Sequence, residues 1–179
     1  DPDDSRLYGT LRSICIDGER EDLALMALQR LVIEHPEHWL LKLNLGWAHR
    51  AVGDEERALA LLEAAVAAPD TTAPDEDLVL AHFELSRVYA EQERLEEASR
   101  VLEDALLLTP DDPRLLVTAG EMQLRRQLLP QAQDFFEQAL DVSTDAGSTA
   151  ARIAMAFYNS GDRRRAILFY ERAIAERPS

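Results

Sequence analysis

A pattern of 34 residues recurs along the chain, and its clearest copy extends from Trp39 to Asp70. This copy predicts two amphipathic helices, because apolar residues spaced three and four apart keep one face of each segment apolar. Between the helices, Gly53 tolerates the left-handed backbone conformation that ends the first one. Asp54 can accept a hydrogen bond from the amides that open the second one. A single helix hairpin cannot bury its own apolar faces, so several copies must stack.

Five copies keep the same phase, and they begin near Ser5, Trp39, Val79, Pro113 and Gly147. Each of the last four copies has a small residue at its eighth position and alanine at its twentieth and twenty-seventh positions. The small residues at the eighth position are Gly46, Ser86, Gly120 and Ala154. Only the step from the second copy to the third is longer, by six residues that lie within 69–77. Because helix axes must approach closely, leucine in place of Gly46 or Ala98 should overpack the contact.

This period, with its early small residue, two alanines and closing proline, resembles the tetratricopeptide repeat family. The resemblance implies an all-α fold, a right-handed superhelical solenoid of five antiparallel helix hairpins that forms a single array over residues 1–179. We expect the array to be cut from a longer one. Pro2 stands where a proline would close a preceding copy, and the last helix has more apolar residues than one buried side needs.

Charge and composition exclude several classes of partner. The formal charge of -15 and the pI of about 4.6 argue against nucleic acid, whose phosphates the protein would repel. The single cysteine, Cys15, falls at a core position, so no disulfide can form within the chain. No apolar run approaches the roughly 20 residues that cross a bilayer, and no signal-peptide pattern is present. We expect a soluble segment without membrane insertion.

The usage of basic residues points to a source. Lys42 is the only lysine, every other strongly basic side chain is arginine, and alanine and leucine are abundant, which is typical of a GC-rich bacterial genome. The cytoplasm and the periplasm both remain open as compartments, and we prefer the periplasm.

Residues suited to catalysis or metal binding do not form a recognisable motif. The nearest metal pattern is His35-Pro36-Glu37-His38, where proline interrupts the helix and the imidazoles are not held one turn apart. The acidic residues of 70–77 lack the glycine and the alternating spacing of a calcium loop, and they more simply favour the N-terminus of a following helix. We expect no catalysis, no cofactor and no metal.

The family resemblance implies a concave groove lined by positions two, five, nine and twelve of each first helix, which share one helical face. In the second copy these are Leu40, Leu43, Trp47 and Arg50, and in the third Leu80, Phe83 and Arg87. The fourth copy contributes Arg114, Val117, Glu121, Leu124 and the adjacent Arg125, and the fifth Met155 and Tyr158. Such a groove suits a partner peptide or helix that presents hydrophobic side chains and a carboxylate.

An opposing interpretation of the same residues stays open. Neighbouring helices can cover Trp47 and Phe83, while the arginines pair with Glu91 or Glu121. The lysine and asparagine with which some family members clamp chaperone tails are absent, since Leu43 and Trp47 stand at these positions in the second copy.

Three functions therefore follow from the resemblance. The first is a protein-interaction scaffold that binds a partner segment in the groove. The second is a structural spacer or assembly segment of a bacterial envelope or secretion complex, such as an exopolysaccharide exporter, in which the terminal helices self-associate. The third is a regulatory segment of a larger enzyme.

Overall fold

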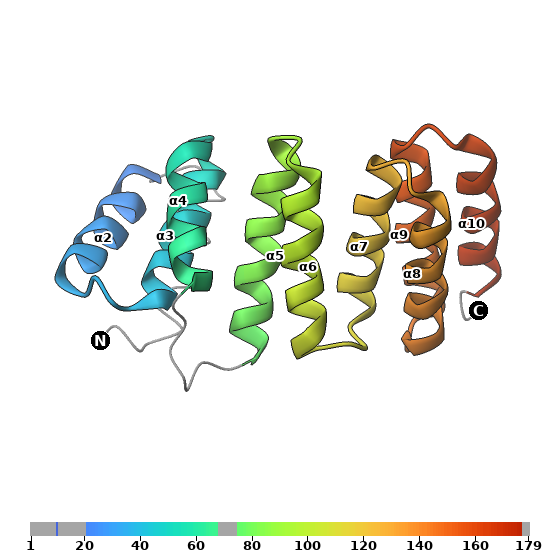
Figure 1. Cartoon of the computed structure of the whole chain (residues 1–179), viewed down its shortest axis with the longest axis horizontal. Coiled ribbons are helices and arrows are strands. Elements are labelled where there is room, and N and C mark those ends of the chain that lie inside the picture. The colour runs from blue at the N-terminus through green and yellow to red at the C-terminus, as the bar shows by residue number, and fades with distance from the viewer. Residues whose placement is uncertain (1–9, 11–20, 68–74, 177–179) are drawn as a thin grey trace. The chain divides into compact units, whose positions relative to one another are not determined.

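The computed structural model describes residue 10 and residues 21–67 and 75–176, and every regular element in these ranges is an α-helix (Figure 1). The all-α prediction is therefore confirmed there. The helices are α2 (Glu21–Glu34), α3 (Trp39–Ala51), α4 (Glu55–Ala67), α5 (Asp75–Glu91), α6 (Leu95–Leu108), α7 (Pro113–Arg125), α8 (Leu129–Val142), α9 (Ala146–Asn159) and α10 (Arg163–Ala175). Cys15 and the rest of the predicted first helix of the first copy, apart from Thr10, lie outside the described residues.

The chain forms two compact units, residues 1–92 and residues 93–179. In unit 1, α3 packs against α2, α4 and α5. In unit 2, α7 packs against α6, α8 and α9, and α10 packs against α9. The single array over 1–179, its right-handed twist and its origin in a longer array stay predictions.

The predicted six-residue insertion within 69–77 lies mostly outside the described residues, but its last part is helical. Asp75, Glu76 and Asp77 form the first turn of α5, which reaches 17 residues. The positive end of the helix dipole favours these carboxylates, so the helix begins earlier than in the other copies.

The turn between paired helices has the predicted geometry at Gly53 and Asp54. The Gly53 amide donates to the Arg50 carbonyl at 3.0 Å, and the Asp54 amide donates to the His49 carbonyl at 2.9 Å. These two bonds satisfy the last carbonyls of α3. The Asp54 carboxylate in turn accepts a hydrogen bond from the Arg57 amide at 3.3 Å. Asp54 thus caps α4, as predicted.

The fifteenth position of the last four copies always has a left-handed backbone. Its φ angle is +80° at Gly53 and +87° at Gly161, but also +58° at Glu93 and +62° at Gln127. A side chain makes this conformation costly, by about 1 kcal/mol or more. The repeat geometry therefore imposes the turn even where the residue type disfavours it.

Small residues at the eighth position allow the close helix contacts that the sequence predicts. A Cβ atom built on Gly46 would lie 2.9 Å from Leu62 Cγ, and one built on Gly120 would lie 2.7 Å from Phe136 Cδ1. Both distances are shorter than any ordinary carbon contact. Leucine at Gly46 would overpack the hairpin, as expected, and leucine at Gly120 would do the same.

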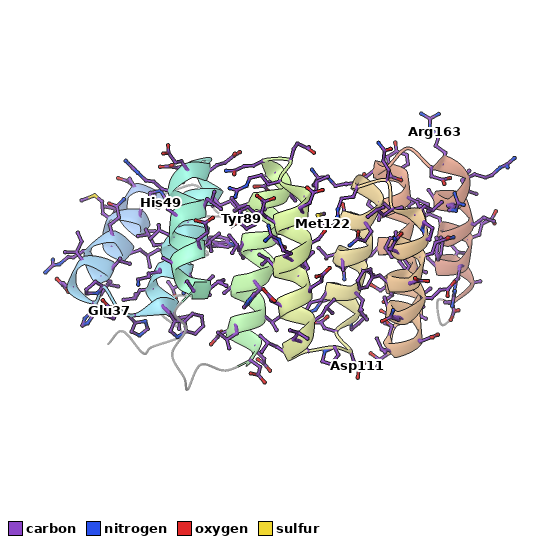
Figure 2. All side chains as sticks on the ribbon, in the orientation of Figure 1. Glu37, His49, Tyr89, Asp111, Met122 and Arg163 are labelled. Carbon is purple, nitrogen blue, oxygen red and sulfur yellow. The ribbon has the colours of Figure 1, made fainter. Side chains whose placement is uncertain are left out.

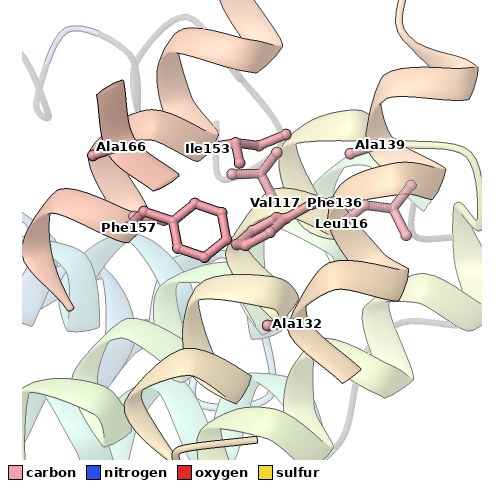
Figure 3. Close-up of a cluster of buried hydrophobic side chains, with 9 residues drawn as sticks. Leu116, Val117, Ala132, Phe136, Ala139, Ile153, Phe157 and Ala166 are labelled. Carbon is pink, nitrogen blue, oxygen red and sulfur yellow. The ribbon is translucent and has the colours of Figure 1, made fainter. Parts of the chain in front are cut away.

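The core of unit 2 is built around the side chain that Gly120 admits. Phe136 contacts Phe157 edge to face, with ring centres 5.3 Å apart (Figure 3). Phe157 in turn stacks on Phe169, with ring centres 5.4 Å apart. Phe136 and Phe157 are fully buried. Aromatic pairs of this kind add to the stability gained from burial alone.

His49 is a buried histidine on α3 (Figure 2). Its Nδ1 atom lies 3.3 Å from Asp54 Oδ2. Burial lowers the pKa of His49 below its ordinary value, and the nearby Asp54 carboxylate offsets this effect only in part. The folded state therefore binds a proton at His49 more weakly than the unfolded state does.

We predict that Gln127→Gly stabilises the protein by roughly 0.5 to 1 kcal/mol, because glycine removes the left-handed penalty at this turn. Urea unfolding followed by circular dichroism measures the change. Gln133→Gly, at an exposed position inside α8, is the matched control and should destabilise by about 1 kcal/mol. Equal losses from the two substitutions would contradict the turn argument.

We predict that Gly120→Ala destabilises the protein by about 1 to 3 kcal/mol through the clash with Phe136, although alanine is the better helix former. The same substitution in a Phe136→Leu background should cost less, because the smaller side chain vacates the space. A double-mutant cycle of unfolding free energies measures this coupling. A stabilising Gly120→Ala in the wild-type background would show that the contact is not tight.

We predict that the free energy of unfolding falls as the pH drops below about 6.5, the ordinary histidine pKa, and continues to fall until the lowered pKa of folded His49 is reached. Above that window the histidine is neutral in both states and has no effect. His49→Gln should flatten the slope between pH 7.5 and 5.5, by at most about 1.4 kcal/mol per pH unit.

Candidate functional site

Two of the predicted groove residues are buried in the units. Leu43 is 1% exposed and Val117 is 2% exposed, and Val117 belongs to the core cluster around Phe136 and Phe157. Side chains at this depth do not contact a partner. These two positions are core residues of their units.

In unit 1 most of the predicted apolar groove residues of α3 and α5 are half-buried, and the two groove arginines differ in whether they form ion pairs. Leu40, Trp47, Leu80 and Phe83 each keep part of their surface accessible. Arg87, one turn beyond Phe83 on α5, is exposed and forms no ion pair within the described residues. It is therefore the groove arginine of unit 1 that remains accessible to a partner.

Arg50 is engaged inside unit 1. Its Nε atom lies 3.3 Å from Glu84 Oε2, and its Nη1 atom lies 2.9 Å from Glu91 Oε1. Glu84 is buried, and a buried carboxylate needs a partner of opposite charge. The alternative in which arginines pair with Glu91 thus holds for Arg50.

In unit 2, two predicted arginines also have carboxylate partners. Arg125 Nη2 lies 3.0 Å from Glu93 Oε1. Arg114 binds Asp112 through two bonds, with Nη2 to Oδ2 at 2.8 Å and Nε to Oδ1 at 3.2 Å. Asp112 also caps α7 through the Arg114 amide, so this carboxylate is fixed in place. The other predicted groove residues of α7 are Glu121 and Leu124, and both are half-buried.

Met155 and Tyr158 are exposed on α9, and they are the most accessible apolar residues of the predicted set. The Tyr170 hydroxyl lies 3.8 Å from Met155 Sδ. Spacings of three place Arg152, Met155 and Tyr158 on neighbouring parts of one helical face.

Arg152 is a residue that the sequence reasoning missed. Its Nη2 atom donates to the backbone carbonyl of Arg114 at 3.4 Å, and no carboxylate pairs with it within the described residues. Partial burial and the positive charge of Arg114 lower the pKa of Arg152, while Asp112 and Glu121 act in the opposite direction. We call Arg114, Arg152, Met155 and Tyr158 the α7–α9 surface. The sequence does contain a sign that these two arginines are neighbours, since Arg114 and Arg152 are separated by one repeat plus one helical turn.

The described residues show neither a metal cluster nor a membrane span. No three histidine, cysteine, aspartate or glutamate side chains gather there as metal ligands would. Among the described helices, none has the length and apolar character needed to cross a bilayer.

Comparisons with known structures place the fold. Tetratricopeptide-like repeats of a kinesin light chain from Podosopora anserina align with a TM-score of 0.78 and 20% identity, covering 98% of this chain and 96% of that one. MamA from Desulfovibrio magneticus RS-1 gives 0.72 and 16%, covering 97% and 95%. MamA from AMB-1 gives 0.66 and 22%, covering 95% and 89%. These likenesses show the solenoid fold.

Sequence comparisons give the family. No curated protein sequence matches the chain. One tetratricopeptide repeat model matches residues 18–74 and 83–151, and a second matches residues 149–179. The chain therefore belongs to the tetratricopeptide repeat family.

Proposed function

We propose that this protein is an interaction scaffold that binds a partner segment carrying hydrophobic side chains and a carboxylate. Members of its family are generally protein-interaction scaffolds without catalytic activity. The α7–α9 surface indicates the chemistry of the partner. The observation that carries the proposal is that no carboxylate pairs with Arg152 among the described residues.

Arg152 lies beside a second arginine in a protein with a formal charge of -15. Two neighbouring guanidinium groups repel each other, and Asp112 is bound to only one of them. A carboxylate from a partner can accept charge-assisted hydrogen bonds from Arg152 and relieve the repulsion. Asp112 and Glu121 attract Arg152 without forming an ion pair with it among the described residues, so the site can accept an anionic group although the protein as a whole repels anions.

Exposed apolar side chains next to Arg152 define the rest of the partner. Met155 adapts to irregular apolar shapes, and Tyr158 offers a large ring with a polar tip. Both lie on the same helix as Arg152, so a segment that presents a carboxylate to the arginine brings its neighbouring side chains onto them. Hydrophobic residues beside the carboxylate would bury this surface.

Unit 1 has a second surface that also combines apolar side chains with an arginine. Phe83 and Arg87 are one turn apart on α5, and Trp47 and Leu80 are half-buried on α3 and α5. Arginine beside aromatic and aliphatic side chains again suits an apolar segment with an acidic group.

A second function, a spacer or assembly segment, is favoured by the exposed apolar residues of α10. Ile167, Leu168 and Ile174 are all accessible on this last helix. Such a face is typical of contact between protein chains rather than of a solvated helix.

The proposal predicts which peptides the protein selects. A phage-displayed library of random dodecapeptides, panned on the 179-residue chain, should yield peptides that combine hydrophobic residues with aspartate or glutamate. Arg152→Gln should weaken the binding of a selected peptide roughly 10- to 100-fold, because a hydrogen bond between charged groups is worth about 1.5 to 3 kcal/mol. Isothermal titration calorimetry measures the dissociation constants.

Matched variants separate this site from general charge effects. Arg100→Gln removes the same charge from an exposed position on α6, where Glu96 and Glu103 are neighbours, and should leave affinity unchanged. Replacing the acidic residue of the peptide by its amide should weaken binding to the wild type but not to Arg152→Gln. Selection of peptides without acidic residues, or equal affinity of wild type and Arg152→Gln, would overturn the proposal. Trp47→Ala with Phe83→Ala tests the unit 1 surface in the same assay.

A further inference from the structure

Arg114, Thr118 and Glu121 share one face of α7, because they are four and three residues apart. Arg152 of α9 lies against this face, since its Nη2 atom donates to the Arg114 carbonyl at 3.4 Å. The Thr118 hydroxyl donates to the same carbonyl at 2.8 Å. A helical carbonyl points toward the C-terminus of its helix, which is here the direction of Glu121. The guanidinium group of Arg152 is thus held near the part of α7 that carries Glu121.

Glu121 is a carboxylate that has no ion pair although it lies near Arg152. Its side chain is half-buried, and no basic side chain of the described ranges pairs with it. Its charge nevertheless attracts Arg152 and acts to raise the pKa of that arginine. Asp112 acts in the same direction, but it is already bound to Arg114. Glu121 is therefore the negative charge next to the α7–α9 surface with which a partner can still pair.

The four charged groups around Arg152 balance before a partner binds. Arg114 and Arg152 are positive, and Asp112 and Glu121 are negative. A carboxylate that binds Arg152 brings a third negative charge close to Glu121, and the repulsion between like charges weakens its binding. A basic group on the same partner segment removes this excess of negative charge if it reaches Glu121.

We propose that the partner segment carries a lysine or arginine near its carboxylate, and that Glu121 binds this basic group while Arg152 binds the carboxylate. This pairing rests on the proposed function and specifies the charge pattern of that same partner. In an extended segment the two charged residues are two positions apart, which places both side chains on one face, about 7 Å apart. In a helical segment they are three or four positions apart.

The charge of the whole chain favours a partner of this kind. A protein with a formal charge of -15 repels a segment whose only charge is negative, and each basic group added to that segment reduces the repulsion. Complementary charges also set the orientation in which two surfaces bind. An acidic and a basic group that pair with Arg152 and Glu121 therefore fix the direction of the segment across α7 and α9.

Peptide binding to Glu121→Gln tests the proposal. Dodecapeptides selected on the wild-type chain should combine hydrophobic residues with an acidic and a basic residue at one of these spacings. Glu121→Gln should weaken the binding of such a peptide roughly fivefold, which is the scale of a partly exposed ion pair. Isothermal titration calorimetry measures the dissociation constants, and circular dichroism verifies that the variant is folded.

A matched variant and a changed peptide assign the effect to one pair of charges. Glu137→Gln removes the same charge from an exposed position on α8 and should leave the affinity unchanged. Replacing the basic residue of the peptide by glutamine should weaken binding to the wild type and to Glu137→Gln, but not to Glu121→Gln. Glu121→Lys reverses the charge, so panning on this variant should yield peptides with two acidic residues at the same spacing.

The sign of the Glu121→Gln effect separates this inference from the proposed function. If Glu121 only repels the carboxylate of the partner, its neutralisation strengthens binding instead of weakening it. Acidic peptides that lack basic residues, or binding to Glu121→Gln at least as tight as to the wild type, would overturn the role of Glu121 and leave the pairing of Arg152 intact. Selection of peptides without acidic residues would instead remove the proposed function and this inference together.

Discussion

The close approach of paired helices at the small eighth position is the constraint on which the rest of each unit depends. In unit 2, the missing side chain of Gly120 lets Phe136 lie against α7, and Phe136 then meets Phe157 of the next hairpin. A single absent side chain thus fixes both the spacing within one hairpin and the contact with its neighbour. In unit 1, Gly46 has the same relation to Leu62. Outward-facing residues of α7 and α9 owe their fixed register to this packing.

Features of the fold that follow from local sterics could be predicted from the sequence. The hairpin period, the glycine turn at Gly53 and the cap at Asp54 each depend on residues adjacent in the chain. The left-handed turns at Glu93 and Gln127 could not be read from residue type, since neither residue favours that conformation. Only their place in the repeat identifies them. The period does not predict that α5 begins as early as Asp75, because a repeat period fixes equivalent positions in successive copies but not the residue at which each helix begins.

The candidate site was less predictable, because helical spacing identifies a face without showing what covers it. The fifth position of the repeat, for example, is buried at Leu43 and Val117 but only half-buried at Phe83. The partners of the arginines depend on neighbouring elements in the same way. Arg50 reaches Glu84 and Glu91 of the next copy, whereas Arg114 takes Asp112 just before it and not Glu121. Arg152 matters only because the fold places it against Arg114.

The excess of acidic over basic residues makes the unpaired arginines informative. With 34 acidic side chains against 19 lysines and arginines, carboxylates and not guanidinium groups should be left without partners. Arg100 is exposed as well, but Glu96 and Glu103 stand one turn away from it on its own helix. Helix α9 has no acidic residue to compensate Arg152, and the arginines that open α10 are followed by Ile167 and Leu168. At Arg152, positive charge and exposed apolar surface thus coincide, and this coincidence is the basis on which we propose an acidic, partly apolar partner.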